Sequence, residues 1–405
     1  MGVAPELARR RRARIAVSAV FFINGVLFAN LVPRLPEVKD RLDLSNGGFG
    51  SAIAAMPAGA LLAGLFAPAL IQRFGSKAVA SSGLVGLALA VAAVPLCGGW
   101  FALAGTMLVI GALDAVIDVG QNAHGFRVQR AYGRSIVNAF HGLWSVGAVT
   151  GGLLGSVAAG LSVPLGAHLT TSGAVCCAFA MLARRFMLDG PEDAERASVA
   201  DVAIPSLRRA GRRTWHVLAV LGVLAACGAF VEDAGASWAA LYLRDEVGAT
   251  AGTVGLGFVV LHIAMTTGRL TGDRVVDRFG QRLVTVVGGS AVAMGMGFAL
   301  ALPSMATTIV GFAAAGLGVA TLVPAVMHAA DELPNLRRGV GLTIVSWLLR
   351  VGFLVSPLLV GIVADAASLR AALLAVVLAG LVIVLLGRAV DVPTGSQVEP
   401  DRLTT

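Results

Sequence analysis

Apolar runs long enough to cross a lipid bilayer recur along almost the whole chain. A membrane-spanning helix needs about 20 predominantly apolar residues, and 57% of the 405 residues are hydrophobic while only 13% are charged. That share of charged residues is too low for an ordinary soluble domain. The runs predict crossings at 15–33, 46–70, 77–97, 100–122, 136–160, 163–183, 214–243, 250–271, 282–302, 306–328, 340–364 and 368–387. We therefore expect an all-α membrane protein with twelve transmembrane helices.

The distribution of Lys and Arg predicts how these helices are oriented. Short cytoplasmic loops are enriched in basic residues, and the segment before the first crossing reads "ARRRRAR". Of the 31 basic residues, those expected on the outer side are Arg34, Lys39, Arg41, Arg244 and Arg370, and Arg350 is expected to be the only one within a crossing. Both termini are thus predicted to be cytoplasmic, in a bacterial inner membrane. No cleavable signal peptide is expected, because the first apolar run continues directly into the rest of the fold.

The net charge of +8 and the four cysteines argue against several classes of function. The basic residues are divided among short loops, so they indicate contact with anionic lipid headgroups and not with nucleic acid. The cysteines lie in apolar runs without metal-ligand spacing, so neither a metal site, nor another cofactor, nor a disulfide framework is expected. No GxSxG, HExxH or phosphate-binding loop motif occurs, which argues against an enzyme. A membrane channel is a further alternative.

The second half of the chain repeats the first at an offset of 205 residues. The segment "VKDRLDLSNGGFG" begins at Val38 and "LRDEVGATAGTVG" begins at Leu243, while "QRFGSK" (72–77) aligns with "DRFGQR" (277–282). Gly111 aligns with Gly316, and Gly147 aligns with Gly352. One register kept across several helices without a gap indicates an internal duplication.

The duplication divides the chain into two bundles of six helices. A polar segment at 184–213 is predicted to be a cytoplasmic linker between bundles at 15–183 and 214–387, and 1–14 and 388–405 are predicted to be cytoplasmic ends. Parallel repeats related by a pseudo-twofold axis along the membrane normal are the architecture of one large class of secondary transporters. In that class the substrate binds near the midplane between the repeats. The sequence therefore predicts a transporter.

The segment "GRLTGDRVVDRFGQR" (268–282) closely resembles the loop signature of the major facilitator superfamily, and the resemblance to that superfamily covers essentially the whole chain. The signature positions are occupied by Gly272, Asp277, Arg278, Gly280 and Arg282. The first-half copy keeps Arg73, Gly75 and Lys77 but has Pro68 and Gln72 at the glycine and aspartate positions. We expect Asp277 to bind the facing helix N-terminus of the other half, in a contact that breaks when access changes. Because Gln72 carries no charge, we expect asymmetric gating.

Three other segments resemble the bacterial YbjJ-like members of the superfamily, which are distantly similar to proton-coupled fucose permeases: "DVGQN" (118–122), "FHGLWSVG" (140–147) and "EDAGASWAALYLRD" (232–245). This chain departs from those relatives at Ser237, where they often carry an acid. Drug–proton antiporters of the superfamily tend to carry Gly-Pro in the fifth helix, where this chain has Ala148. The resemblance thus implies a monomeric, proton-coupled symporter of a small polar solute, such as a sugar or sugar-like metabolite. Proton-coupled efflux of drugs or metabolites is the alternative.

Two pairs of acids are the candidates for proton coupling. Asp114 and Asp118 lie one helical turn apart on one face of the fourth crossing. A charge at the bilayer centre costs about 2.5–3.5 kcal/mol on insertion scales, so it usually faces a cavity or a partner. Loss of water favours the protonated form of a carboxyl group, which lets it exchange protons as a cavity opens and closes. Glu232 and Asp233 lie about 100° apart on the seventh crossing, and the resemblance favours Glu232. Structural ion pairs and polar contacts between helices are the alternatives.

The remaining candidates are basic, polar and aromatic. Arg350 is expected to pair with Asp114 or Glu232, or to clamp an anionic group of the substrate. His141 either couples to the protonation of Asp118 or forms a hydrogen bond between helices. Side chains that would bind the substrate through hydrogen bonds or stacking, or would simply pack, are Asn24, Gln121, Asn122, Asn138, Trp144, Trp238 and Trp347.

Overall fold

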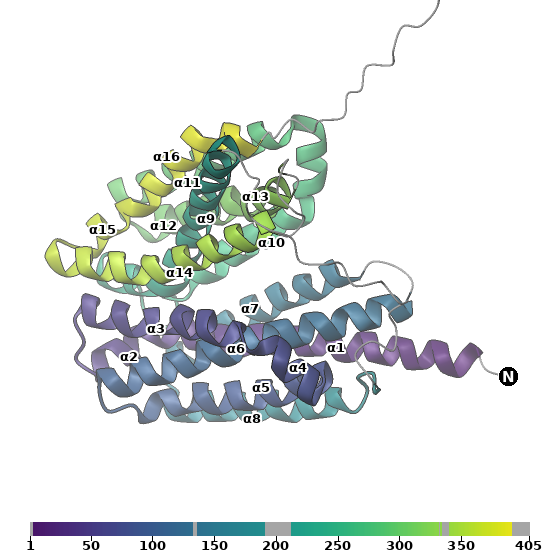
Figure 1. Cartoon of the computed structure of the whole chain (residues 1–405). Helices are drawn as coiled ribbons and strands as arrows, with labels where there is room; N and C mark the ends of the chain where they lie inside the picture. Colours follow the sequence, from purple (N-terminus) through teal and green to yellow (C-terminus); the bar gives the residue numbers. More distant parts are fainter. Residues whose placement is uncertain (1–2, 133–135, 191–211, 332, 334–339, 391–405) are drawn as a thin grey trace, which may run out of the picture.

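The computed structural model describes residues 3–132, 136–190, 212–331, 333 and 340–390, and this part of the chain is helical, without strands. Figure 1 shows two layers of helices, one formed by the first half of the chain and the other by the second half. The part of the predicted linker beyond residue 190 and the part of the predicted tail beyond residue 390 lie outside the described residues.

The first layer begins with a long helix that is followed directly by two short helical segments. Its elements are α1 (Val3–Leu31), η1 (Val32–Arg34), α2 (Leu35–Arg41), α3 (Asn46–Gly64), α4 (Ala67–Phe74), α5 (Ser76–Ala93), η2 (Val94–Leu96), α6 (Trp100–Tyr132), α7 (Val137–Gly160) and α8 (Leu165–Arg184). In the second layer the elements are α9 (Arg212–Asp245), α10 (Leu256–Phe279), α11 (Gln281–Ala301), α12 (Met305–Val319), α13 (Leu322–Asp331), α14 (Val340–Ala366), α15 (Leu369–Ala372), α16 (Leu374–Leu386) and η4 (Gly387–Val390).

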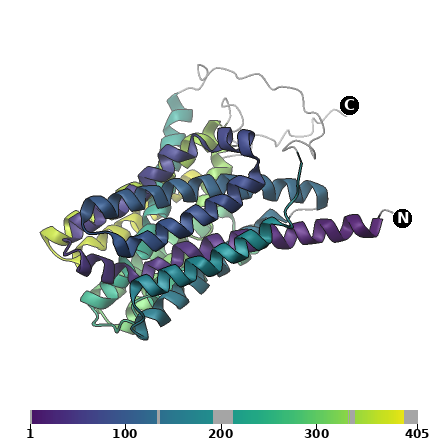
Figure 2. The same cartoon turned by 90° about the horizontal axis from the view of Figure 1, so that it is seen from below.

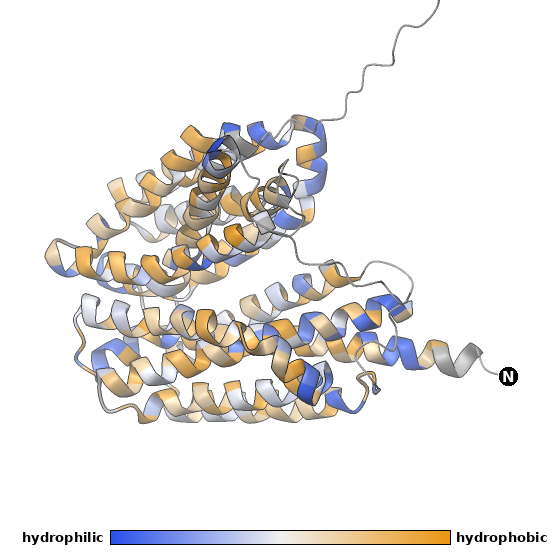
Figure 3. Cartoon of the chain, in the orientation of Figure 1, coloured by the Kyte–Doolittle hydropathy of each residue, from blue (hydrophilic) through white to orange (hydrophobic). Residues whose placement is uncertain are grey.

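The helices match the predicted crossings, and the fold class is confirmed. In the described ranges, 11 helical segments are long and apolar enough to cross a membrane, and α10, with 24 residues, occupies the place of the remaining crossing. Large apolar side chains such as Leu62, Phe101 and Leu385 are mostly exposed, as expected of surfaces that face lipid. In Figure 3 the apolar residues cover the middle of the helices and the polar residues gather toward their ends.

Several boundaries differ from the predicted ones. Helix α1 begins at Val3, so it includes the basic segment that the sequence assigned to a separate cytoplasmic end, and Figure 2 shows its first turns extending beyond the bundle. Helix α6 continues to Tyr132, well past the predicted end at residue 122. The predicted crossing at 306–328 is divided between α12 and α13. The apolar pattern marks the part of a helix that spans the membrane, so it does not predict the residue at which the helix begins or ends.

The duplication is visible in the backbone. Gly75 and Gly280, which are equivalent in the two halves, have nearly identical dihedral angles, with φ of 81° and 80°, and each lies directly before a helix. A positive φ at this turn requires glycine. A side chain at Gly111 would collide with the carbonyl oxygen of Met56, and one at Gly316 would collide with that of Leu261, which is the equivalent residue. Small residues thus let the same pair of helices approach closely in both halves.

The two halves are held together at one end of the molecule. The backbone N–H groups of Asn46 and Gly47, in the first turn of α3, donate to the two carboxylate oxygens of Asp365 on α14, each at 2.7 Å. Nearby, Arg244 of α9 forms an ion pair with Asp40 of α2. The first N–H groups of a helix lack partners within it and carry a partial positive charge, so a carboxylate binds them well. These contacts close the end that the sequence predicts to be the outer one.

Removal of the Asp365 carboxylate should loosen this end. A charged side chain at a helix N-terminus is worth about 1 kcal/mol, so Asp365→Ala should raise the population open at this end about fivefold. We would measure the labelling rate of Ser237→Cys by a membrane-impermeant maleimide in intact cells, with the four native cysteines replaced. Asp43→Asn, an exposed acid of the same region at a positive φ that Asn tolerates, is the matched control. Equal labelling rates in the two variants would contradict a closing role for Asp365.

Candidate functional site

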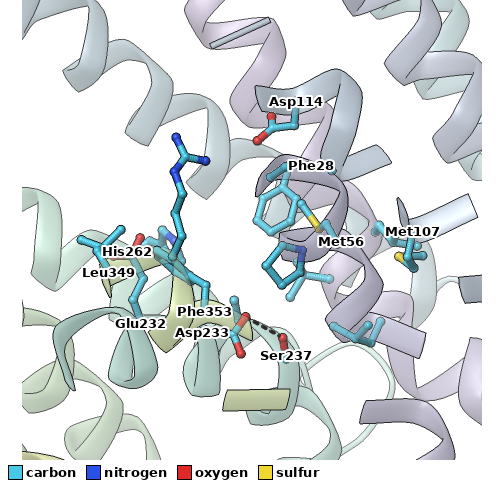
Figure 4. Close-up of a pocket in the computed structure, with 18 of the residues that line it drawn as sticks. Phe28, Met56, Met107, Asp114, Glu232, Asp233, Ser237, His262, Leu349 and Phe353 are labelled. Atoms are coloured by element: carbon cyan, nitrogen blue, oxygen red, sulfur yellow. Dashed lines mark hydrogen bonds between the residues drawn. The ribbon is translucent and has the colours of Figure 1, made fainter. Parts of the chain in front are cut away.

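A cavity of about 400 Å³ lies between the two halves, inward of the closed end. The first half contributes Phe28, Leu31, Val32, Leu35, Ile53, Met56, Pro57, Ala60, Met107, Gly111, Asp114 and Trp144. The second half contributes Glu232, Asp233, Ala236, Ser237, His262, Met327, Ser346, Leu349, Arg350 and Phe353. Figure 4 shows Asp114 on one wall, with Glu232, Asp233 and His262 across the cavity from it. Five residues proposed from the sequence are therefore brought together, namely Asp114, Trp144, Glu232, Asp233 and Arg350.

Asp114 is held by a chain of hydrogen bonds that joins three helices. The indole Nε1 of Trp144 on α7 donates to Oδ1 of Asn24 on α1, at 2.6 Å. The amide Nδ2 of Asn24 then donates to Oδ1 of Asp114 on α6, at 3.1 Å. Asn24 is only 2% exposed, so it lies behind the cavity wall and orients the carboxylate. Both ends of its amide take part in these bonds, and Asn24 is not among the residues that line the cavity.

Asp118, one turn further along α6, does not line the cavity. Its Oδ1 accepts hydrogen bonds from Nδ2 of Asn122 at 2.9 Å and from Nε2 of Gln121 at 3.4 Å. The imidazole Nε2 of His141 on α7 donates to Oδ1 of Asn122, at 3.1 Å. Asp118 and His141 are both exposed. The acid and the histidine are thus linked through an amide, and the two aspartates of α6 belong to separate hydrogen-bond networks.

Glu232 and Asp233 both line the cavity, although they are adjacent in α9. The hydroxyl of Ser237 donates to Oδ1 of Asp233, at 3.2 Å, as the dashed line in Figure 4 shows. The other carboxylate oxygen, Oδ2, is buried without a hydrogen-bond partner among the described residues. The hydroxyl of Ser356 on α14 also lies close to Asp233, and it donates to the backbone carbonyl of Phe230, at 3.4 Å. Asp233 therefore carries a carboxylate that the protein only partly satisfies.

Two residues of α10 were missed by the sequence analysis. Arg269 lies 3.6 Å from Glu232, between Nη2 and Oε2, and it falls within the predicted crossing at 250–271, so Arg350 is not the only basic residue of the predicted crossings. Arg269 is part of the segment at 268–282 that resembles the loop signature, and counting it with that charged loop concealed its partner. His262 is buried and lines the cavity, and its Nδ1–H donates to the carbonyl of Phe258 at 3.0 Å. The position of both residues within an apolar run was the available signal.

Arg350 of α14 lies on the cavity wall and acts electrostatically on both Asp114 and Asp118 across the boundary between the halves. Its predicted pairing with an acid of the other half is therefore compatible with the structure. Glu232, the other predicted partner of Arg350, is the acid that Arg269 contacts.

The two other tryptophan candidates lie away from the cavity. Trp238 is completely buried and packs edge-on against Phe49, with ring centroids 5.6 Å apart. Trp347 is 48% exposed and does not line the cavity. Asn138 is part of α7, but its side chain lies outside the described part of the structure. Trp144 is therefore the one predicted tryptophan that contributes to the described cavity.

The loop signature lies at the opposite end of the molecule from Asp365. Gly272 is buried against Thr321, whereas Asp277, Arg278, Gly280 and Arg282 are all exposed. In the first-half copy, Arg73 is exposed and Lys77 donates to the carboxylate of Asp189, at 2.7 Å. Lys77 thus binds the beginning of the linker region rather than the other half. The expected binding of Asp277 to a facing helix N-terminus stays a prediction for the state in which this end is closed.

Comparison with known proteins identifies relatives along the full chain. A family model described as Major Facilitator Superfamily matches residues 218–403. The chain is 31% identical over 399 residues to the membrane protein MosC of Rhizobium meliloti, across 95% of this chain and 92% of that protein. It is 28% identical over 390 residues to an uncharacterized MFS-type transporter of Yersinia pestis, across 96% of this chain and 97% of that protein.

Solved structures of transporters share the fold at low sequence identity. The nucleoside transporter NupG superposes with a TM-score of 0.72 at 12% identity, over 93% of this chain and 98% of that one. A bacterial homolog of the human lysosomal transporter Spinster, in an inward-facing and occupied conformation, gives 0.71 at 14% identity, over 96% and 97%. FucP in the outward conformation gives 0.61 at 17% identity, over 94% and 98%.

The contact between Lys77 and Asp189 predicts a small, pH-dependent contribution to stability. The hydrogen bond from Lys77 holds the pKa of the Asp189 carboxyl below its usual range. A lowered pKa means that the contribution is present above the pKa of the unfolded state, about 3.9, and is lost as the pH falls through the folded value. Because the Asp189 side chain is 85% exposed, Asp189→Asn should lower the free energy of unfolding by less than about 1 kcal/mol at pH 7.

The measurement is denaturant unfolding of the purified protein in detergent at pH 7 and at pH 3. The difference between the wild type and Asp189→Asn should vanish at pH 3. Lys77→Gln, which breaks the same contact from the other side, should show the same loss at pH 7. A difference that stays unchanged between the two pH values would rule out the contact as its source.

Proposed function

Because the chain belongs to the major facilitator superfamily, we propose that it is a secondary active transporter that moves a small organic solute by proton-coupled alternating access. Its membership and its fold make it a multi-pass membrane transporter, and they indicate a transporter rather than an enzyme. The proton gradient would supply the energy without a cofactor. We place the protein in the bacterial inner membrane as a monomer with both termini in the cytoplasm.

The observation that carries this proposal is the cavity between the halves, with acids from both of them on its walls. Asp114 comes from the first half, and Glu232 and Asp233 come from the second. Keeping a carboxylate charged after it has lost contact with water costs free energy, and binding of a proton or of a cation removes that cost. Movement of one half against the other changes the water contact of these groups. Proton uptake and release would thereby be linked to which side is open.

The state of the structure supports alternating access as the mechanism. Contacts between the halves close the end that bears Asp365 and Arg244, and the signature residues at the other end are exposed. With the closed end taken as the outer side, as the basic residues predict, the molecule is inward-facing. The cavity would then exchange solute with the cytoplasm.

Symport of a small polar solute, such as a sugar or a sugar-like metabolite, is the form of this function that the sequence favours. Two of the similar structures are a nucleoside transporter and FucP, which is consistent with a polar solute. Proton-coupled efflux is the second candidate, and one observation favours it: most of the residues that line the cavity are apolar. Both forms use the same carboxylates.

Asp114 and Asp118 should differ in their importance for coupling. Only Asp114 lines the cavity, so Asp114→Asn should abolish stimulation by a pH gradient, while Asp118→Asn, a matched change one turn away, should keep most of it. One pH unit is worth about 1.4 kcal/mol per proton, which allows up to about tenfold accumulation.

The ligand for this test would come from a thermal-shift screen of sugars, nucleosides, amino acids, organic acids and amines on the purified protein. Its uptake or release would then be followed in proteoliposomes with and without a pH gradient. The proposal fails if saturable transport by the wild type is indifferent to the gradient. Conductance without saturation would indicate a channel.

A further inference from the structure

Negative charge predominates on the cavity walls. Asp114, Glu232 and Asp233 face a single arginine, Arg350, among the described residues that line the cavity. Arg269, from outside the lining, contacts Glu232 at 3.6 Å. Asp114 and Asp233 then remain, with only Arg350 to offset them. The cavity is consequently short of positive charge.

Neutral hydrogen bonds do not make up for this shortage. Asp233 has one oxygen bonded to the Ser237 hydroxyl and a buried second oxygen without a hydrogen-bond partner among the described residues. Asp114 accepts one hydrogen bond, from Asn24. The Nδ1–H of His262 donates to the carbonyl of Phe258, so this N–H group is not available to either carboxylate. Carboxylates with so few donors are completed by a cation that brings its own N–H groups.

The rest of the wall is mostly apolar and offers few neutral groups that bind hydroxyls, chiefly the side chains of Ser237 and Ser346. Phe28, Met56, Met107, Leu349 and Phe353 form much of the surface, and Figure 4 shows these side chains around the space between the acids. None of the described residues that line the cavity carries an amide side chain. A solute rich in hydroxyl groups would leave many of its donors and acceptors unpaired there. The apolar part of a ligand, by contrast, would be shielded from water by these apolar side chains, which favours its binding.

We propose that the cavity selects an organic amine, a compound with a protonated primary or secondary amino group on an apolar body, recognised by the carboxylates of Asp114 and Asp233. The inference rests on the proposed function in one respect, that this cavity is the transport site. Its volume of about 400 Å³ lies within the range of pockets that hold small organic ligands. The apolar body lies against the Phe and Met side chains, where flexible thioethers adapt to different shapes.

This assignment has a consequence for the direction of coupling. An ammonium group and protons compete for the same two carboxylates, so protonation of Asp114 or Asp233 releases the amine. The other charged or titratable groups around them are Glu232 and Arg269, which contact each other, His262 and Arg350 on the walls, and Asp118 one turn along α6. Competition of this kind produces exchange of amine for protons, which favours efflux by antiport over symport.

The experiment compares three probes of the same shape and different charge on the purified full-length protein: 4-phenylbutylamine, 4-phenylbutan-1-ol and 4-phenylbutanoate. Affinities are measured by isothermal titration calorimetry in detergent at pH 7.5. The amine should bind about 10- to 100-fold more tightly than the alcohol, as expected for a hydrogen bond to a charged group. The proposal is overturned if the alcohol binds as tightly as the amine, or if the acid binds more tightly than either.

Variants locate the site, and the wild type alone provides a second readout. Asp114→Asn and Asp233→Asn should each weaken amine binding at least tenfold and leave the alcohol unchanged, while Asp43→Asn, an exposed acid that does not line the cavity, is the control and should leave both unchanged. In the wild type, amine affinity should fall as the pH is lowered from 7.5 to 5.5, and binding should release protons, seen as a dependence of the heat on buffer ionisation enthalpy. If the wild type binds the amine with an affinity that does not depend on pH and without releasing protons, the proposal is overturned, even if the variants do not fold.

Failure of this inference can be told apart from failure of the proposed function. If the amine binds as expected but no pH gradient drives its movement in proteoliposomes, proton coupling is wrong and the ligand class stands. If a neutral solute is carried by the gradient and the amine does not bind, the ligand class is wrong and proton-coupled transport stands.

Discussion

The absence of water inside a bilayer is the constraint on which the structure depends. Backbone groups there must bond within the chain, which leaves helices as the spanning elements of this protein, and charged side chains must find a partner or a cavity. The central charges follow this rule in different ways. Glu232 meets Arg269 within its own half, Asp114 is held by Asn24 and lies near Arg350 of the other half, and Asp233 keeps an oxygen unpaired. The least satisfied groups face the space between the halves, where a ligand or a proton can reach them.

Because of the duplication, equivalent helix positions of the two halves line the cavity, whereas the residue types at these positions differ between the halves. At the offset of 205 residues, Asp233 is equivalent to Phe28, Ser237 to Val32, His262 to Pro57 and Leu349 to Trp144, and both members of each pair line the cavity. The same helix positions therefore face the centre in both halves. The first half presents mostly apolar side chains there, and the second presents most of the titratable ones. This asymmetry places the titratable groups of the cavity mainly on the second half.

The sequence predicts the frame well because its signals are long and repeated. The twelve apolar runs, the offset of 205 residues and the glycines at the turns before α5 and α11 are each evident without a structure. The acids of the cavity were found because a carboxylate in an apolar run is conspicuous. Trp238 and Trp347 could not be assigned to a side in the same way, since a membrane helix is apolar both toward lipid and toward its neighbours. Arg269 was missed because it lies within the charged segment at 268–282, whereas no charged loop conceals His262, which lies in an apolar run.

Transport by alternating access limits how strongly the contacts of one conformational state can stabilise that state. Two states of a carrier must differ by only a few kcal/mol if both are to be visited, so the contacts at the closed end cannot be much stronger than those that replace them. The Asp365 carboxylate on the N-terminus of α3 and the pair between Arg244 and Asp40 are partly exposed to water, which keeps each of them modest. At the other end the signature residues Asp277 and Arg278 are exposed. In the proposed alternating-access cycle these residues would form contacts of the same type when their end closes, and the energy difference between the two states would have to be small enough for a proton or a bound solute in the cavity to reverse it.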